Sequence, residues 1–178
     1  KELGLKVIVT MPSNMSIERI NLLKKYDAEV ILTDATLGMN GSNELASKSS
    51  KENNYFEINQ FTSIYNQEAH FETMKEILND LQDVDYIICG IGSVGTISGL
   101  SRYIKEHNLN IKVIGIEPDE SAIITKGIKG EHAIQGIGAG FIPPLLNLDN
   151  IYKIECVKSI DVLEEFKNKK EISLGLSS

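Results

Sequence analysis

The residues best placed to do chemistry are the glycines and hydroxyl side chains of one short loop. Gly90, Gly92 and Gly95 form the pattern G-x-G-x-x-G, with Ser93 and Thr96 beside them. Glycines let a backbone approach an anion closely, and the amides at a helix N-terminus supply hydrogen-bond donors and a partial positive charge. The two hydroxyls can add donors to the same oxygens. We therefore predict that this loop binds a phosphate group.

The segments on either side of the loop agree with this prediction. Residues 85–89 form an apolar, β-type run, and Leu100, Tyr103 and Ile104 follow the loop at helical spacing. A glycine loop between a strand and a helix presents its amides at the helix N-terminus, which is where phosphates bind.

A dinucleotide and a phosphate monoester are both compatible with the loop. Glu117 ends the next predicted strand about where a dinucleotide fold places its ribose-binding acid, so a nicotinamide-dependent dehydrogenase is one hypothesis. Pro118 follows that acid directly, and nothing later in the chain resembles a hydride-transfer site. The hydroxyls of Ser93, Thr96 and Ser98 suit a terminal phosphate better than a bridging pyrophosphate. A purely structural glycine turn is a third interpretation, because a single match of this kind is weak.

Further motifs follow one another along the chain. They are Thr-Met-Pro at 10–12, Met-Ser-Ile-Glu-Arg at 15–19, Gly-Met-Asn-Gly at 38–41, Asn-Gln-Phe at 59–61, Gln-Gly-Ile-Gly-Ala-Gly-Phe-Ile-Pro at 135–143 and Gly-Leu-Ser-Ser at 175–178. With the glycine loop, they resemble the cysteine synthases (O-acetylserine sulfhydrylases), which are fold-type II pyridoxal-phosphate enzymes. The resemblance covers the whole chain in the family's order and roughly its spacing. It implies pyridoxal 5′-phosphate as the cofactor.

The resemblance implies that the glycine loop holds the cofactor phosphate. The residues that align with the family's phosphate cup are Gly92, Ser93, Val94, Gly95 and Thr96. The family usually has glycine at the third position, so Val94 departs from the pattern. This departure matters little only if the φ angle of Val94 is negative and its side chain points away from the loop.

Other residues align with the family's ring and substrate sites. Ser177 aligns with the serine whose hydroxyl faces the pyridine nitrogen, and Gln60 with a glutamine that lines the substrate pocket. Gly136 and Gly138 fall in the loop that closes on the bound amino acid, where glycines avoid a clash and let the backbone hinge. Met39 resembles a methionine of a mobile segment, and a core position explains it equally well. The other four residues have plain structural alternatives. The alternative for Ser177 is an exposed chain end, for Gln60 an exposed strand end, and for Gly136 and Gly138 an ordinary surface loop.

Two parts of the family's site have no counterpart in these 178 residues. Family members carry, upstream of the segment that matches Lys1, a lysine that forms the Schiff base with the cofactor. They also carry there a Ser-Gly-Asn-Thr-Gly loop that binds the substrate carboxylate. We therefore expect an internal fragment of a longer protein, without a catalytic residue in this segment and inactive alone.

The resemblance implies that the parent protein makes L-cysteine from O-acetylserine and sulfide by β-replacement. Cystathionine β-synthase, or a related β-eliminating enzyme, is the alternative within the family, although the motifs at 38–41 and 138–141 look more like cysteine synthase. A non-catalytic phospholigand-binding domain and the dehydrogenase domain are the alternatives from other classes. The resemblance also implies a homodimer and an association with serine acetyltransferase.

Composition limits the other possibilities. A net charge of −7 and a pI near 5.0 give no electrostatic footprint for nucleic acid. No apolar run approaches the length that crosses a bilayer, and no signal-peptide pattern is visible. Cys89 and Cys156 lie in apolar runs without C-x-x-C spacing, so we expect reduced core cysteines and a cytoplasmic protein. His70, His107 and His132 lack partners at metal-ligand spacing, so we interpret them as surface or helix-face residues.

Alternating strand-like and helix-like segments predict an α/β fold with parallel sheets covered by helices. The resemblance implies the tryptophan synthase β-like fold of the fold-type II enzymes. The expected strands are 5–10, 29–33, 85–89, 112–117 and 151–157, and the expected helices start at Ser16, near Ser42, at Glu68, after the glycine loop and at Ser159. We place a domain boundary at 62–67. Residues 1–62 would belong to a smaller N-terminal α/β domain, and 63–178 to most of a larger domain that binds the cofactor phosphate.

Overall fold

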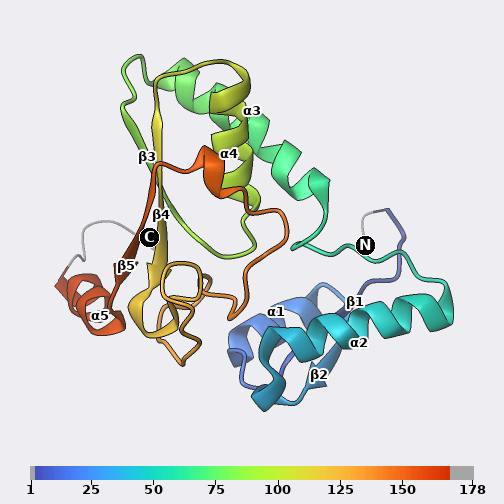
Figure 1. Ribbon diagram of the computed structural model, residues 1–178. Coiled ribbons are helices and arrows are strands. Elements are labelled where there is room, and N and C mark those ends of the chain that lie inside the picture. The colour runs from blue at the N-terminus through green and yellow to red at the C-terminus, as the bar shows by residue number, and fades with distance from the viewer. Residues whose placement is uncertain (1–2, 169–178) are drawn as a thin grey trace. The chain divides into compact units, whose positions relative to one another are not determined.

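The computed structural model describes residues 3–168 of the chain. It forms two compact units, Lys1–Asn59 and Gln60–Ser178. Parallel strands alternate with helices in both units, which confirms the predicted α/β class (Figure 1).

The first unit is a βαβ arrangement followed by a long helix. Strands β1 (Ile8–Pro12) and β2 (Glu29–Thr33) pair in parallel, and helix α1 (Ile17–Lys25) connects them. A 3-10 helix, η1 (Ala35–Leu37), leads into α2 (Gly38–Asn53). The predicted bounds of β2 are confirmed, whereas β1 starts three residues later than expected and α2 starts four residues before Ser42.

Hydroxyl groups tie α2 to the two strands of this unit. Thr10 Oγ1 donates to the carbonyl oxygen of Ser42 at 2.9 Å, and Thr33 Oγ1 lies 2.7 Å from Ser42 Oγ. Ser42 is buried. Because buried hydroxyls need partners, these bonds fix the start of α2 against the ends of the strands.

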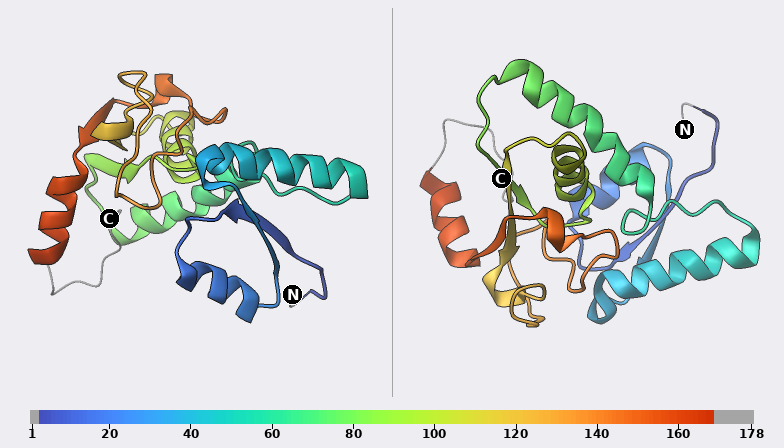
Figure 2. Two further views of the ribbon diagram at one scale, coloured as in Figure 1. Left: turned by 90° about the horizontal axis from the view of Figure 1, so that it is seen from below. Right: turned by 45° about the horizontal axis from the view of Figure 1, so that its top comes forward.

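The second unit contains a three-stranded parallel sheet in the order β3–β4–β5. The strands are β3 (Tyr86–Gly90), β4 (Lys112–Pro118) and β5 (Lys153–Val157). The helices are α3 (Ile64–Asp80), α4 (Gly95–Glu106) and α5 (Ser159–Asn168), with 3-10 turns η2 (Asp119–Ser121) and η3 (Leu148–Asn150). Helices α3 and α4 lie side by side, and α4 connects β3 to β4 (Figure 2).

The core of the second unit lies between this helix pair and the sheet. Met74 of α3, Ile97 and Leu100 of α4 and Val113 of β4 are almost fully buried there. The opposite face of β3 is open, since Tyr86 and Ile88 are 51% and 65% exposed. Side chains alternate between the two faces of a strand, so β3 has one apolar face in the core and one apolar face outside it.

Close packing sets the distance between α3 and α4. A Cβ atom added at Gly99 of α4 would lie 2.3 Å from the carbonyl oxygen of Gln67 and 2.7 Å from Cβ of His70, both on α3. A residue larger than glycine would push the helices apart. Gly99 therefore fixes the position of α3 relative to the loop that precedes α4.

Two absences hold for residues 3–168. No helix there is long and apolar enough to cross a membrane. No group of three or more His, Cys, Asp or Glu residues in the same range could hold a metal ion.

Candidate phosphate site

The predicted phosphate loop connects the end of β3 to the first residue of α4. Its first intrahelical hydrogen bond runs from the Ser98 amide to the Val94 carbonyl oxygen at 2.9 Å. The amides that precede Ser98 in the first turn therefore have no acceptor within the helix. They stand at the positive end of the helix dipole, which is the arrangement that binds a phosphate.

Val94 does not have the negative φ angle under which its departure from the family's glycine would matter little. Its φ angle is +67° and ψ is 3°, so it adopts the left-handed conformation that the family's usual glycine adopts easily. Its side chain is 3% exposed and packs in the core cluster. A β-branched residue in this conformation is strained, and burial of its side chain offsets part of the cost.

Two glycines of the loop have no room for a side chain. A Cβ atom at Gly92 would lie 2.5 Å from the Gly136 carbonyl oxygen. At Gly95 it would lie 2.4 Å from Oδ1 of Asn66. A larger residue would therefore have to displace the backbone of Gly136 at the first position and the side chain of Asn66 at the second.

The hydroxyls of the loop contact two side chains that the sequence did not single out as site residues. Asn66 Nδ2 donates to Ser93 Oγ at 3.2 Å and to the carbonyl oxygen of Gln60 at 2.8 Å. His70 Nε2 lies 3.1 Å from Thr96 Oγ1. Burial lowers the pKa of His70 below its usual value. Asn66 falls in the stretch 62–67 that the sequence suggests as a domain boundary, and His70 was expected at a surface or on a helix face; both lie on α3 and face the loop.

The predicted closing loop also packs beside the cradle. Gly138 donates its amide hydrogen to the Ile91 carbonyl oxygen at 2.9 Å, and His132 Nε2 lies 3.1 Å from the Gly138 carbonyl oxygen. Gly136 and Gly138 have φ angles of 103° and 67°, where glycine is strongly favoured. The structure thus brings the phosphate loop, Gly136 and Gly138 together.

The remaining predicted site residues are placed as follows. The side chain of Gln60 is exposed, and its carbonyl oxygen reaches the phosphate loop through Asn66. Ser177 lies outside the described residues. Met39 is half-buried near the start of α2 in the first unit.

Glu117 does not act as a ribose-binding acid in this structure. Its buried carboxylate accepts hydrogen bonds from the amides of Ile124 and Thr125 at 3.1 and 3.0 Å and from the Thr125 hydroxyl at 2.5 Å. Both carboxylate oxygens have donors, so the carboxylate organises the turn after β4. This arrangement removes the main support for a dinucleotide site.

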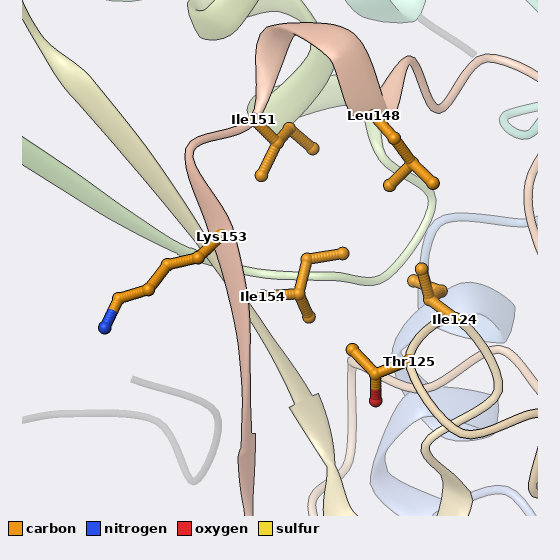
Figure 3. Close-up of a pocket in the computed structure, with 6 residues that line it drawn as sticks. All are labelled: Ile124, Thr125, Leu148, Ile151, Lys153 and Ile154. Atoms are coloured by element: carbon orange, nitrogen blue, oxygen red, sulfur yellow. The ribbon is translucent and has the colours of Figure 1, made fainter.

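An aliphatic hollow of about 250 Å³ lies elsewhere in the second unit (Figure 3). Its lining consists of Ile124, Thr125, Leu148, Ile151, Lys153 and Ile154. The ammonium group of Lys153 points away from the hollow in Figure 3. The hollow shares no residue with the phosphate loop and offers little to recognise an anion.

Comparison with known proteins decides between the ligand classes. The family model described as pyridoxal-phosphate dependent enzyme matches residues 1–165. The chain belongs to this family. Pyridoxal phosphate carries a terminal phosphate monoester, and the glycine cradle with its uncapped helix amides fits such a group. The predicted cofactor and family are thereby confirmed.

Individual relatives agree with the family. The chain is 37% identical to a cysteine synthase of Staphylococcus aureus over 98% of its own length and 58% of the relative's length. It matches the crystal structure of a cysteine synthase from Entamoeba histolytica with a TM-score of 0.90 and 39% identity, over 99% of this chain and 54% of that one. An O-acetylserine dependent cystathionine β-synthase from Helicobacter pylori gives a TM-score of 0.90 and 30% identity, over 99% and 60%. The chain spans less than two thirds of each relative's length.

Proposed function

We propose that the parent protein is a cysteine synthase, which converts O-acetylserine and sulfide to L-cysteine with pyridoxal phosphate. The observation that carries the proposal is the loop from Gly92 to Thr96, whose free helix amides and glycine cradle fit the cofactor phosphate. Membership of the pyridoxal-phosphate dependent family and the likeness to cysteine synthases support it.

Each residue of the proposed site has a role that follows from its chemistry. The amides of the loop and the hydroxyls of Ser93 and Thr96 hold the phosphate and fix the position of the ring. When bound, the cofactor supplies the electron sink for loss of the β-substituent. The loop with Gly136 and Gly138 covers the amino acid and excludes water.

Two further residues complete the proposal. Gln60 lines the substrate pocket at the start of the second unit. Ser177 places a neutral hydroxyl against the pyridine nitrogen and, unlike a carboxylate, does not hold that nitrogen protonated. We place the lysine that binds the cofactor upstream of Lys1, so the segment alone should show no turnover.

The proposal includes the cellular setting of the enzyme. We infer a cytoplasmic homodimer that acts on small molecules and binds serine acetyltransferase, with no nucleic-acid or membrane partner. We also infer that 1–62 belongs to the smaller domain of the parent and 63–178 to the larger, phosphate-binding domain. Size-exclusion chromatography of the full-length protein, with and without serine acetyltransferase, tests the assembly.

Substitution of Gly95 tests the phosphate site. Gly95→Asp adds bulk where Asn66 already lies and a negative charge beside the phosphate, so pyridoxal phosphate should no longer bind to the full-length protein. Gly127→Asp is the matched control, because Gly127 is exposed, has open space around it and has a positive φ that Asp tolerates. A Gly95→Asp variant that binds the cofactor as tightly as the wild type would contradict the assignment.

Cystathionine β-synthase is the second candidate, because the Helicobacter pylori enzyme of that name has the same fold at 30% identity. The two activities differ in the nucleophile that attacks after the leaving group departs. Turnover of O-acetylserine with sulfide and with homocysteine, measured side by side, separates them. A higher kcat/KM with homocysteine than with sulfide would favour cystathionine β-synthase over cysteine synthase.

A further inference from the structure

We propose that Asn66 and His70 of α3 are positioning residues that turn the hydroxyl protons of Ser93 and Thr96 toward the bound phosphate. This inference rests on the proposed function for the identity of the phosphate ligand. The sequence motifs that identify the loop do not include either residue.

The two residues form one recognition face on α3. They are four positions apart, which places them on the same side of a helix, one turn from each other. Asn66 contacts Ser93 and His70 contacts Thr96, so each hydroxyl of the loop has its own partner on α3. The glycine contact between α3 and α4 at Gly99 holds this face at a fixed distance from the loop.

The contacts of Asn66 determine the direction of the Ser93 proton. The Gln60 carbonyl oxygen can only accept, so the Asn66 atom at 2.8 Å from it must be the NH₂ group. The same NH₂ group donates its second hydrogen to Ser93 Oγ at 3.2 Å. Ser93 is therefore an acceptor toward Asn66, and its own proton is available to the anion.

The same reasoning applies to His70 and the proton of Thr96. Burial favours the neutral ring by lowering the pKa of His70, and a neutral imidazole has one donor and one acceptor nitrogen. His70 Nδ1 lies 3.2 Å from Thr73 Oγ1, and Nε2 lies 3.1 Å from Thr96 Oγ1. If Thr73 donates to Nδ1, Nε2 carries the hydrogen and donates to Thr96. The Thr96 hydroxyl then directs its own proton to the phosphate.

The alternative tautomer would use the Thr96 proton for a bond to His70 and leave the phosphate one donor short. Hydrogen bonds to charged groups are about twice as strong as neutral ones, so a bound phosphate selects the arrangement in which both hydroxyls donate to it. The hydroxyl of Thr73 thus acts on the phosphate through two intervening groups.

Substitutions that change the donor capacity of Asn66 and His70 test the proposal in the full-length protein; Asn66→Asp also adds a negative charge, so the uncharged His70 variants separate loss of a donor from charge repulsion. His70→Leu removes the donor to Thr96, whereas His70→Gln supplies an amide that can still donate. Asn66→Asp replaces the donor by an acceptor, which takes up the Ser93 proton. We expect His70→Leu and Asn66→Asp each to weaken pyridoxal phosphate binding by about tenfold or more, and His70→Gln to restore most of the loss.

The readout is the ratio of the affinities for pyridoxal phosphate and for pyridoxal, which lacks the phosphate, measured by absorbance titration. Inorganic phosphate binding, followed by ³¹P line width, is the second probe. Asn79→Ala is the control, because Asn79 is exposed near the end of α3 and bonds only to Asp80 among the contacts described for it. A structural defect would weaken both vitamers alike, whereas loss of a phosphate donor lowers the ratio.

The outcomes separate this inference from the proposed function. Wild-type protein that binds inorganic phosphate but not pyridoxal phosphate would overturn the proposed function, and the phosphate affinities of the variants would still decide the role of α3. Unchanged affinity ratios and phosphate affinities in His70→Leu and Asn66→Asp would overturn the positioning role. Failure of the wild type to bind either ligand would overturn both.

Discussion

Replacement of Gly92 by alanine should separate the phosphate loop from the loop that contains Gly136. The added Cβ atom would lie 2.5 Å from the Gly136 carbonyl oxygen. An ordinary carbon–oxygen contact is about 3.3 Å or more, so one loop has to retreat by roughly 0.8 Å. A retreat of that size lengthens the 2.9 Å bond from the Gly138 amide to the Ile91 carbonyl oxygen beyond hydrogen-bond range.

The energetic cost follows from these changes. Loss of the hydrogen bond costs about 1 kcal/mol. Overpacking against a backbone atom costs about 1–3 kcal/mol. The φ angle of Gly92 is outside the left-handed region, so alanine also gains about 0.4–1 kcal/mol through the unfolded state. We expect the free energy of unfolding to fall by about 2 kcal/mol, together with weaker phosphate binding.

Two measurements check this expectation. Urea unfolding gives the change in stability, and hydrogen–deuterium exchange of the peptide that contains Gly138 reports the broken bond. Gly127→Ala is a comparison variant that has no steric contact but adds the strain of a φ of 67°, a term that Gly92→Ala lacks, so the two variants separate steric contact from backbone strain. If Gly92→Ala kept both the wild-type urea midpoint and the wild-type protection at Gly138, the contact would not be a constraint and the reasoning would fail.

Two more predictions concern Val94 and Cys89. Val94→Gly relieves a left-handed φ of 67° worth about 1–2 kcal/mol and removes a buried side chain worth about 1.5–3 kcal/mol, so the urea midpoint should fall only slightly while phosphate affinity is kept. A loss of binding would mean that the valine side chain shapes the loop. Burial raises the pKa of the Cys89 thiol from its ordinary value of 9.0 to about 11, so between these two pH values the folded protein holds the thiol protonated while the unfolded chain ionises it. The stability contributed by this thiol is therefore complete below pH 9 and declines between about pH 9 and 11, and a Cys89→Ala variant should show a shallower fall in urea midpoint over that interval. Equal slopes in the two proteins would contradict this.

The sequence predicted the parts of the structure that depend on local patterns. Apolar runs identified β2 and β3, and the glycine spacing identified the start of α4. Helix α3 begins at Ile64, four residues before the predicted start at Glu68. The sequence did not reveal this first turn, because Tyr65, Asn66 and Gln67 do not show an apolar helical repeat. Gln67 is nevertheless buried and donates to the Ser98 carbonyl oxygen at 3.2 Å. That stabilising contact comes from tertiary packing, which local patterns do not reveal.

The candidate site also has one part that local sequence patterns predict and another part that they do not. The loop of Gly92 and Gly95 was recognisable because glycines at this spacing between a strand and a helix are typical of a phosphate-binding loop. The pairing of Ser93 with Asn66 joins positions 27 residues apart, and a polar residue near a predicted boundary gives no sign of such a partner. The positive φ of Val94 was equally hidden, because residue type predicts a negative value and only the packing of its buried side chain supports the observed one.

The open face of β3 has a consequence for how the second unit behaves in solution. Tyr86 and Ile88 expose apolar surface, and among the described strands β3 pairs with β4 alone. A short apolar strand with a free edge is a template for pairing with another chain. Asp83 and Asp85 precede this strand, and charges at such positions oppose that pairing. Removal of these two charges by Asp83→Asn and Asp85→Asn should therefore lower the solubility of this unit.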